Sequence, residues 1–140
     1  VVEENVVHHV QDFANQITLS VSCEEKTNLI AGTLFGSKNY RFVRFNDFYL
    51  EVIPDGYILA LHNYDRPGVI GKATSILGSH QINVSRMQLT LDKAFVQESS
   101  ESCLQEAVSF INIDQPINET ILEELLKLEN VITVHQIDLN

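Results

Sequence analysis

The chain has 140 residues, 44% of them hydrophobic, so it can hold one ordinary domain, or one small domain and part of another. Its 19 acidic residues against 9 basic ones give a formal net charge of −10, which disfavours nucleic acid and anionic membrane surfaces as partners. The sequence shows no apolar run of membrane-spanning length and no recognisable signal segment, so we expect a cytoplasmic protein.

The cysteines and the first residue indicate what kind of chain this is. Cys23 and Cys103 are too few for a disulfide framework and wrongly spaced for a zinc site, so we expect two free thiols. The chain begins at Val1 rather than Met, which suggests a piece of a longer protein or a tag removed by a protease.

Short strands with almost no helix are predicted for the first part of the chain, residues 1–55. Apolar and polar residues alternate in these strands, and Asn46-Asp47 has the composition of a hairpin turn. Pro54-Asp55-Gly56 then breaks the chain and is the predicted boundary between two parts. The predicted strands are Ile17–Val21, Leu29–Phe35, Arg41–Phe45 and Phe48–Val52.

The second part, residues 56–140, reads as strand, helix, strand, strand, helix, strand. Pro67 opens the first helix, where its missing N–H costs nothing, and Gln81 follows that helix. Asn118 is a good N-cap for the second helix, and Asn130 tolerates the left-handed conformation that ends helices. The order predicts an α+β, ferredoxin-like fold, a sheet with both helices on one face. The predicted strands are Tyr57–His62, Ile82–Leu91, Ala107–Ile113 and Val131–Leu139, with a polar loop over Asp92–Ser102.

Catalytic and metal-binding signatures are missing from the sequence. Gly32–Lys38 has glycines, a serine and a lysine, but their spacing and order differ from those of a phosphate-binding loop. His8-His9 has no third ligand nearby, which indicates solvated histidines rather than a metal site. We therefore predict no catalytic residue, no metal and no cofactor in this chain.

Lys38, Arg41 and Arg44 form the one basic cluster of an acidic chain. A site for a small anion is one interpretation. The simpler interpretation, which we favour, is that the arginines solvate strand edges, where charge discourages aggregation.

The loop Asn63–Val69 joins a strand to a helix, which places the N–H groups of Gly68 and Val69 at a positive helix end. An amino-acid carboxylate suits that place, and Asp65 can receive the ammonium group. Asn83, which opens the next strand, offers a donor and an acceptor, and we expect both side chains to flank one helix N-terminus. The alternative is that Asp65 only caps the helix and Asn83 only fills a turn.

Residues Leu61–Leu89, which include L-H-N-Y-D-R-P-G-V-I-G-K-A-T, resemble an ACT domain, and closely the one that ends bacterial D-3-phosphoglycerate dehydrogenases. N-L-I-A-G-T-L-F-G (Asn28–Gly36), R-F-V-R-F-N-D-F (Arg41–Phe48) and P-D-G-Y (Pro54–Tyr57) resemble the regulatory, allosteric substrate-binding domain inserted before it in longer members. The resemblance implies that residues 1–55 are the end of that inserted domain and residues 56–140 the ACT domain.

In that family, ACT domains pair and L-serine binds between them as a feedback inhibitor. The resemblance places the ligand on Asp65 of one subunit, Asn83 of the other, and the backbone after Pro67. It implies a homodimer or larger homo-oligomer, and a longer enzyme that oxidises 3-phosphoglycerate with NAD through residues preceding Val1. This chain alone would then be inactive.

Two departures from the family and two rivals remain. Gln81 replaces the usual Gly, and Lys93–Ser102 replaces a shorter glycine-rich turn. The chain could instead belong to an iron–sulfur L-serine dehydratase, or be a stand-alone ACT sensor of another amino acid. A G-x-G-x-x-G motif after a strand upstream of Val1 would favour the dehydrogenase.

Overall fold

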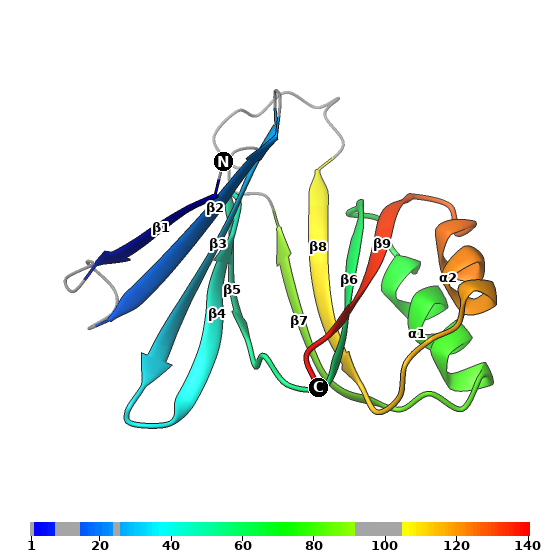
Figure 1. Cartoon of the computed structure of the whole chain (residues 1–140). Coiled ribbons are helices and arrows are strands. Elements are labelled where there is room, and N and C mark those ends of the chain that lie inside the picture. The colour runs from blue at the N-terminus through cyan, green and yellow to red at the C-terminus, as the bar shows by residue number, and fades with distance from the viewer. Residues whose placement is uncertain (1, 8–14, 24–25, 92–104) are drawn as a thin grey trace. The chain divides into compact units, whose positions relative to one another are not determined.

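A computed structural model describes residues 2–7, 15–23, 26–91 and 105–140 (Figure 1). Residue contacts divide the chain into two compact units, Val1–Pro54 and Asp55–Asn140. The sequence placed this boundary one residue later, after Asp55. His8-His9, the whole predicted loop Asp92–Ser102, and Cys103 lie outside the described residues.

The first unit contains a five-stranded antiparallel sheet in the order β1-β2-β3-β4-β5. The four predicted strands are confirmed, and Asn46 takes a positive φ of 50° in the two-residue turn between β4 and β5. Strand β1 was not predicted, because Glu3-Glu4-Asn5 interrupts its apolar residues; the strand is recognisable only through its pairing with β2. The strands are β1 (Val2–Val7), β2 (Gln16–Cys23), β3 (Lys26–Phe35), β4 (Asn39–Phe45) and β5 (Phe48–Val52).

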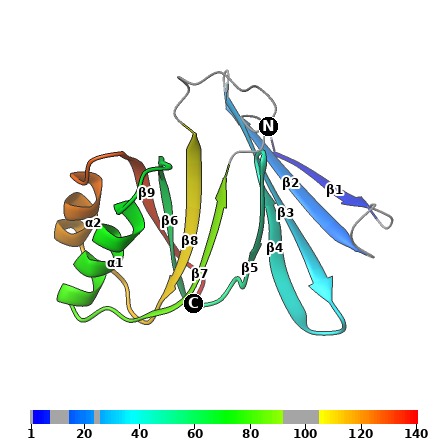
Figure 2. The same ribbon diagram turned by 180° about the vertical axis from the view of Figure 1, so that it is seen from behind.

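The second unit has the predicted ferredoxin-like order, with an antiparallel sheet arranged β7-β8-β6-β9. Helices α1 and α2 lie side by side on one face of this sheet, as Figures 1 and 2 show from opposite sides. The elements are β6 (Tyr57–Tyr64), α1 (Val69–Ser79), β7 (Val84–Leu91), β8 (Glu106–Ile113), α2 (Glu119–Leu126) and β9 (Val131–Asp138).

The core of the second unit lies between the two helices and the sheet. Its side chains come from the apolar stripes of both helices and from alternate residues of the strands, which is why the periods of the sequence predicted these elements. Burying each of the larger side chains contributes roughly 1.5–3 kcal/mol relative to leaving it in water. The most buried members are Leu59, Leu61, Ala73, Leu77, Ile111 and Leu125.

The ends of α2 follow the sequence prediction, whereas the start of α1 differs from it. The Asn118 side chain accepts a hydrogen bond from the Ile121 N–H at 3.0 Å, and Asn130 has a φ of 71°. Helix α1 begins at Val69, two residues after Pro67, because Gly68 takes a left-handed φ of 89° and so stands outside the helix.

Candidate functional site

The N-terminus of α1 follows directly from β6 through residues 65–68. Gly68 is its N-cap residue, yet none of the described side chains caps this end, and its first turn contains no acidic residue. The Val69 N–H makes only a long hydrogen bond of 3.4 Å to the Arg66 carbonyl. A helix end with open N–H groups and a positive dipole is suited to a carboxylate.

Gly68 determines the shape of this end. Its φ of 89° is a conformation that residues with a side chain rarely adopt. A Cβ added at Gly68 would meet no atom within 4 Å, so the space above its backbone is open. Glycine is therefore required by the backbone conformation, and a ligand has room to approach.

Asp65 stands at the base of the same loop. Its N–H donates to the Gln105 carbonyl at 2.7 Å, and the Tyr64 N–H donates to the Asn130 carbonyl at 2.8 Å. These bonds anchor the loop to the neighbouring chain segments. The Asp65 carboxylate is exposed and does not cap α1, which excludes the alternative that it serves only as a helix cap in this structure.

Asn63 is a polar residue that the sequence analysis did not single out. Only 2% of it is exposed, its amide donates to the Tyr64 carbonyl at 2.8 Å, and its Oδ1 has no partner in the described part of the chain. It alternates with Leu59 and Leu61, which face the helices, so it lies on the helix-facing side of β6 just before the loop. A polar residue in a core-facing position of the strand was the signal that could have revealed it.

Ser109 shares the environment of Asn63. It is fully buried, it pairs with Leu61 and Leu89 across the sheet, and its hydroxyl has no described partner. Buried polar groups without partners are uncommon in native proteins and cost roughly 1–3 kcal/mol each. Asn63 and Ser109 thus each place one buried polar atom without a described partner on the helix-facing side of the sheet.

Asn83 lies at the other end of the sheet. Ile113 pairs with both Tyr57 and Val84, so β6 and β7 begin at the same end. Asn83 precedes β7 at that end, whereas Asp65 follows the last residue of β6. Since β6 has 8 residues, the two ends are about 24 Å apart at roughly 3.4 Å per residue.

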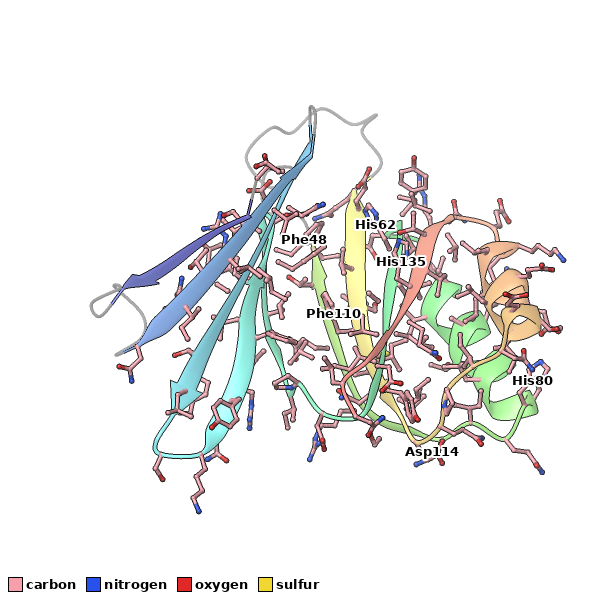
Figure 3. The ribbon with its side chains drawn as sticks, in the orientation of Figure 1. Phe48, His62, His80, Phe110, Asp114 and His135 are labelled. Atoms are coloured by element: carbon pink, nitrogen blue, oxygen red, sulfur yellow. The ribbon has the colours of Figure 1, made fainter. Side chains whose placement is uncertain are left out.

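Within one chain, the expectation that Asp65 and Asn83 flank the same helix N-terminus is therefore wrong. Figure 3 labels a residue near each end of the sheet: His62 on β6, toward the Asp65 end, and Asp114 beyond β8, at the Asn83 end. Helix α1 runs back along the sheet between the two, so residues near in sequence become distant in space.

The connection from α1 to β7 is a tight, hydrogen-bonded turn. The Gln81 N–H donates to the Gly78 carbonyl at 3.0 Å, and the Ile82 N–H donates to the Leu77 carbonyl at 2.9 Å. These two bonds define a Schellman motif, which normally has glycine in the left-handed position. Gln81 occupies that position with a φ of 59°, which confirms the prediction of a helix that ends on a non-glycine residue.

The basic cluster is divided among separate partners. Arg41 Nε lies 3.5 Å from Glu51 Oε1, and Arg44 Nη2 lies 3.9 Å from Asp47 Oδ1. Lys38 is exposed in the turn after β3. Strand β4 lies between β3 and β5, so the interpretation that its arginines solvate a sheet edge is wrong.

Arg41 also lines a groove of about 660 Å³ on the first unit, which the sequence analysis did not predict. The residues that line this groove are mostly apolar and include Ile17, Gly32, Leu34 and Phe42. Arg44 and Lys38 are not part of this lining, so the groove does not gather the three basic residues around one anion.

The described residues were compared with the requirements of a metal-binding cluster and of a membrane-spanning helix. Among them, no group of three or more His, Cys, Asp or Glu side chains is arranged to hold a metal ion. Likewise, neither described helix is long and apolar enough to cross a membrane.

Comparison with known proteins gives one family and several relatives. The ACT domain profile matches residues 57–130. The chain is 29% identical over 139 residues to a D-3-phosphoglycerate dehydrogenase of Archaeoglobus fulgidus, a match that covers 99% of this chain and 25% of the relative. A D-3-phosphoglycerate dehydrogenase of Bacillus subtilis is 25% identical over 136 residues, covering 97% of this chain and 24% of the relative. The chain thus spans about a quarter of the length of these relatives.

A relative of another kind also matches. The probable L-serine dehydratase beta chain of Bacillus subtilis is 28% identical over 137 residues, a match that covers 97% of this chain and 58% of the relative. The similarity therefore covers both units of the chain, in relatives named as dehydrogenases and in one named as a dehydratase chain.

Proposed function

The chain belongs to the ACT domain family, and from this premise we propose that it is the regulatory region of a D-3-phosphoglycerate dehydrogenase that binds L-serine. Dehydrogenase relatives that match 97–99% of the chain support this assignment over both units. In the proposed protein, NAD and 3-phosphoglycerate are bound by other parts of the longer enzyme, and this region senses the end product as a feedback inhibitor.

The single observation that carries the proposed ligand site is the uncapped N-terminus of α1, which follows β6 just after Asn63, whose buried Oδ1 has no partner among the described residues. The ligand carboxylate would bind at the open N–H groups near Gly68. Its ammonium would meet the exposed carboxylate of Asp65 in a charge-assisted hydrogen bond. The unpaired Oδ1 of Asn63 supplies a buried acceptor at the end of β6, next to the loop.

A second copy of the chain completes the proposed site. Strand β7 is an edge strand, and Met87 and Leu89 on it remain 45% and 40% exposed. Antiparallel pairing of two β7 strands about a twofold axis turns the second copy end for end. Its Asn83 then comes to the end of the sheet where Asp65 of the first copy lies, which explains why one chain keeps these residues apart.

Titration calorimetry with L-serine, L-alanine and L-phenylalanine tests this proposal. We expect binding of L-serine and rejection of L-phenylalanine, because Asn83 has to reach the ligand. Asp65→Ala and Asn83→Ala should each weaken binding about tenfold or more, since a hydrogen bond to a charged group is worth roughly 1.5–3 kcal/mol. Asp47→Ala, which removes a carboxylate in the first unit, is the matched control and should bind normally.

Two results would overturn the serine assignment. One is equal heat from L-serine and L-phenylalanine. The other is the absence of L-serine binding by a chain that sedimentation shows to be dimeric.

The second candidate is the regulatory part of an L-serine dehydratase, which the match to 58% of the Bacillus subtilis beta chain favours. Both candidates use the same ligand site, so binding data do not separate them. The gene upstream of Val1 does: a G-x-G-x-x-G motif after a strand supports the dehydrogenase, and its absence from the complete reading frame supports the dehydratase.

A further inference from the structure

We propose that Asp114 is a positioning residue for the ligand site, because it holds Asn83 in the orientation in which that residue reaches a second copy. The inference rests on the proposed function and adds a residue that does not touch the ligand. Asp114 follows β8 and precedes α2, at the end of the sheet opposite the Asp65 loop (Figure 3).

Asp114 satisfies both backbone groups of Asn83. The Asn83 N–H donates to Asp114 Oδ1 at 3.0 Å, and the Asp114 N–H donates to the Asn83 carbonyl at 3.2 Å. This reciprocal pair stands one step beyond the last β7–β8 pair, Val84 with Ile113. Asp114 therefore extends the strand pairing to include Asn83.

The residues before Asn83 are held from two sides. The Schellman bonds tie Gln81 and Ile82 to the last turn of α1. The Gln115 side-chain amide donates to the Gln81 carbonyl at 3.1 Å. Asp114 and Gln115 together thus fix residues 81–83 from the β8–α2 loop.

The side chain of Asn83 remains available in this arrangement. Asn83 is exposed, and its side-chain amide bonds to none of the residues that the structure describes. Because the Asn83 backbone is held at both polar groups, only its side chain has to be ordered when it meets a ligand on another chain, which lowers the cost of binding. Losing the Asp114 carboxylate should therefore weaken ligand binding while the fold and the pairing of chains persist.

The test compares two substitutions at one position. Asp114→Ala removes the acceptor for the Asn83 N–H, and Asp114→Asn keeps an oxygen there. By calorimetry, Asp114→Ala should weaken L-serine binding roughly three- to tenfold, and Asp114→Asn should restore binding close to that of the unmodified chain. Asn118→Ala is the matched control, because it removes a similar side-chain bond to a backbone N–H without contact to Asn83.

A double mutant separates positioning from a general structural role. If Asp114 acts through Asn83, Asp114→Ala combined with Asn83→Ala should bind L-serine no more weakly than Asn83→Ala alone. Additive losses, failure of Asp114→Asn to restore binding, or unchanged binding in Asp114→Ala would each overturn the inference. No binding of L-serine by the dimeric unmodified chain overturns the proposed function and this role of Asp114 with it.

Discussion

Asn63 offers a perturbation whose effects on stability and on binding should have opposite signs. Replacing it with Leu removes a buried Oδ1 that has no partner in the described residues and places an apolar side chain beside Leu59 and Leu61. If Asn63 had a structural role alone, its replacement would lower both stability and ligand binding, or neither.

The change in stability follows from three terms. Removing an unsatisfied buried acceptor relieves roughly 1–3 kcal/mol, and losing the bond from the Asn63 amide to the Tyr64 carbonyl costs about 1 kcal/mol. Burial of the leucine side chain adds a further favourable term, because only 2% of this position is exposed. We expect the Asn63→Leu chain to gain about 1–2 kcal/mol in the free energy of unfolding.

The change in binding should be a loss. In the proposed site the Asn63 oxygen accepts a hydrogen bond from the ligand ammonium, and its removal should weaken L-serine binding about tenfold or more. Thermal unfolding without ligand and calorimetry with L-serine measure the two effects separately. A gain of 1 kcal/mol corresponds to a rise in Tm of about 4–8 °C for a domain of 60–100 residues.

Ser109→Ala is the control for this prediction. It removes another buried and unpaired polar atom, so it should leave stability unchanged or slightly raised while L-serine binding stays normal. A lower Tm for Asn63→Leu would contradict this prediction, because it would mean that the Asn63 oxygen has a partner in solution. The prediction also fails if Asn63→Leu binds L-serine as well as the unmodified chain.

Two further predictions concern the turn after α1 and the edge strand. Gln81→Gly should raise the free energy of unfolding by about 1 kcal/mol in chemical unfolding, because an L-residue in the left-handed conformation costs roughly 1–2 kcal/mol. A lower free energy of unfolding for Gln81→Gly would show that the Gln81 backbone is not strained. Leu89→Lys places a charge on the exposed edge of β7, so sedimentation at micromolar concentration should change from a dimer to a monomer and L-serine binding should be lost. A dimer that persists in Leu89→Lys would place the interface elsewhere.

Local signals in the sequence were sufficient for most of the second unit. Asn118 and Asn130 mark the ends of α2 because capping and left-handed backbone depend on the residue itself and its near neighbours. Strand β1 has no such signal, since its position depends on pairing with β2. The pairing of segments that are distant in the chain cannot be predicted from either segment alone.

The loop that precedes α1 was predicted from the sequence, whereas the position of Asn83 relative to it was not. Asp65 and Gly68 were found from a strand-to-helix loop, which is a local pattern. The placement of Asn83 depends on the direction in which α1 crosses the sheet, and that follows from the topology of the whole unit. Asn63 was overlooked because its burial depends on the packing of both helices over β6.

The 8-residue length of β6 has a consequence for how the proposed sensor responds to its own concentration. A chain that keeps Asp65 and Asn83 at opposite ends of this strand has no complete site until it meets another chain. Ligand binding and subunit association are then thermodynamically coupled, so each strengthens the other by the same factor. Dilution of the protein alone would lower its apparent affinity for the amino acid, and a rise in the amino acid would draw free chains into pairs.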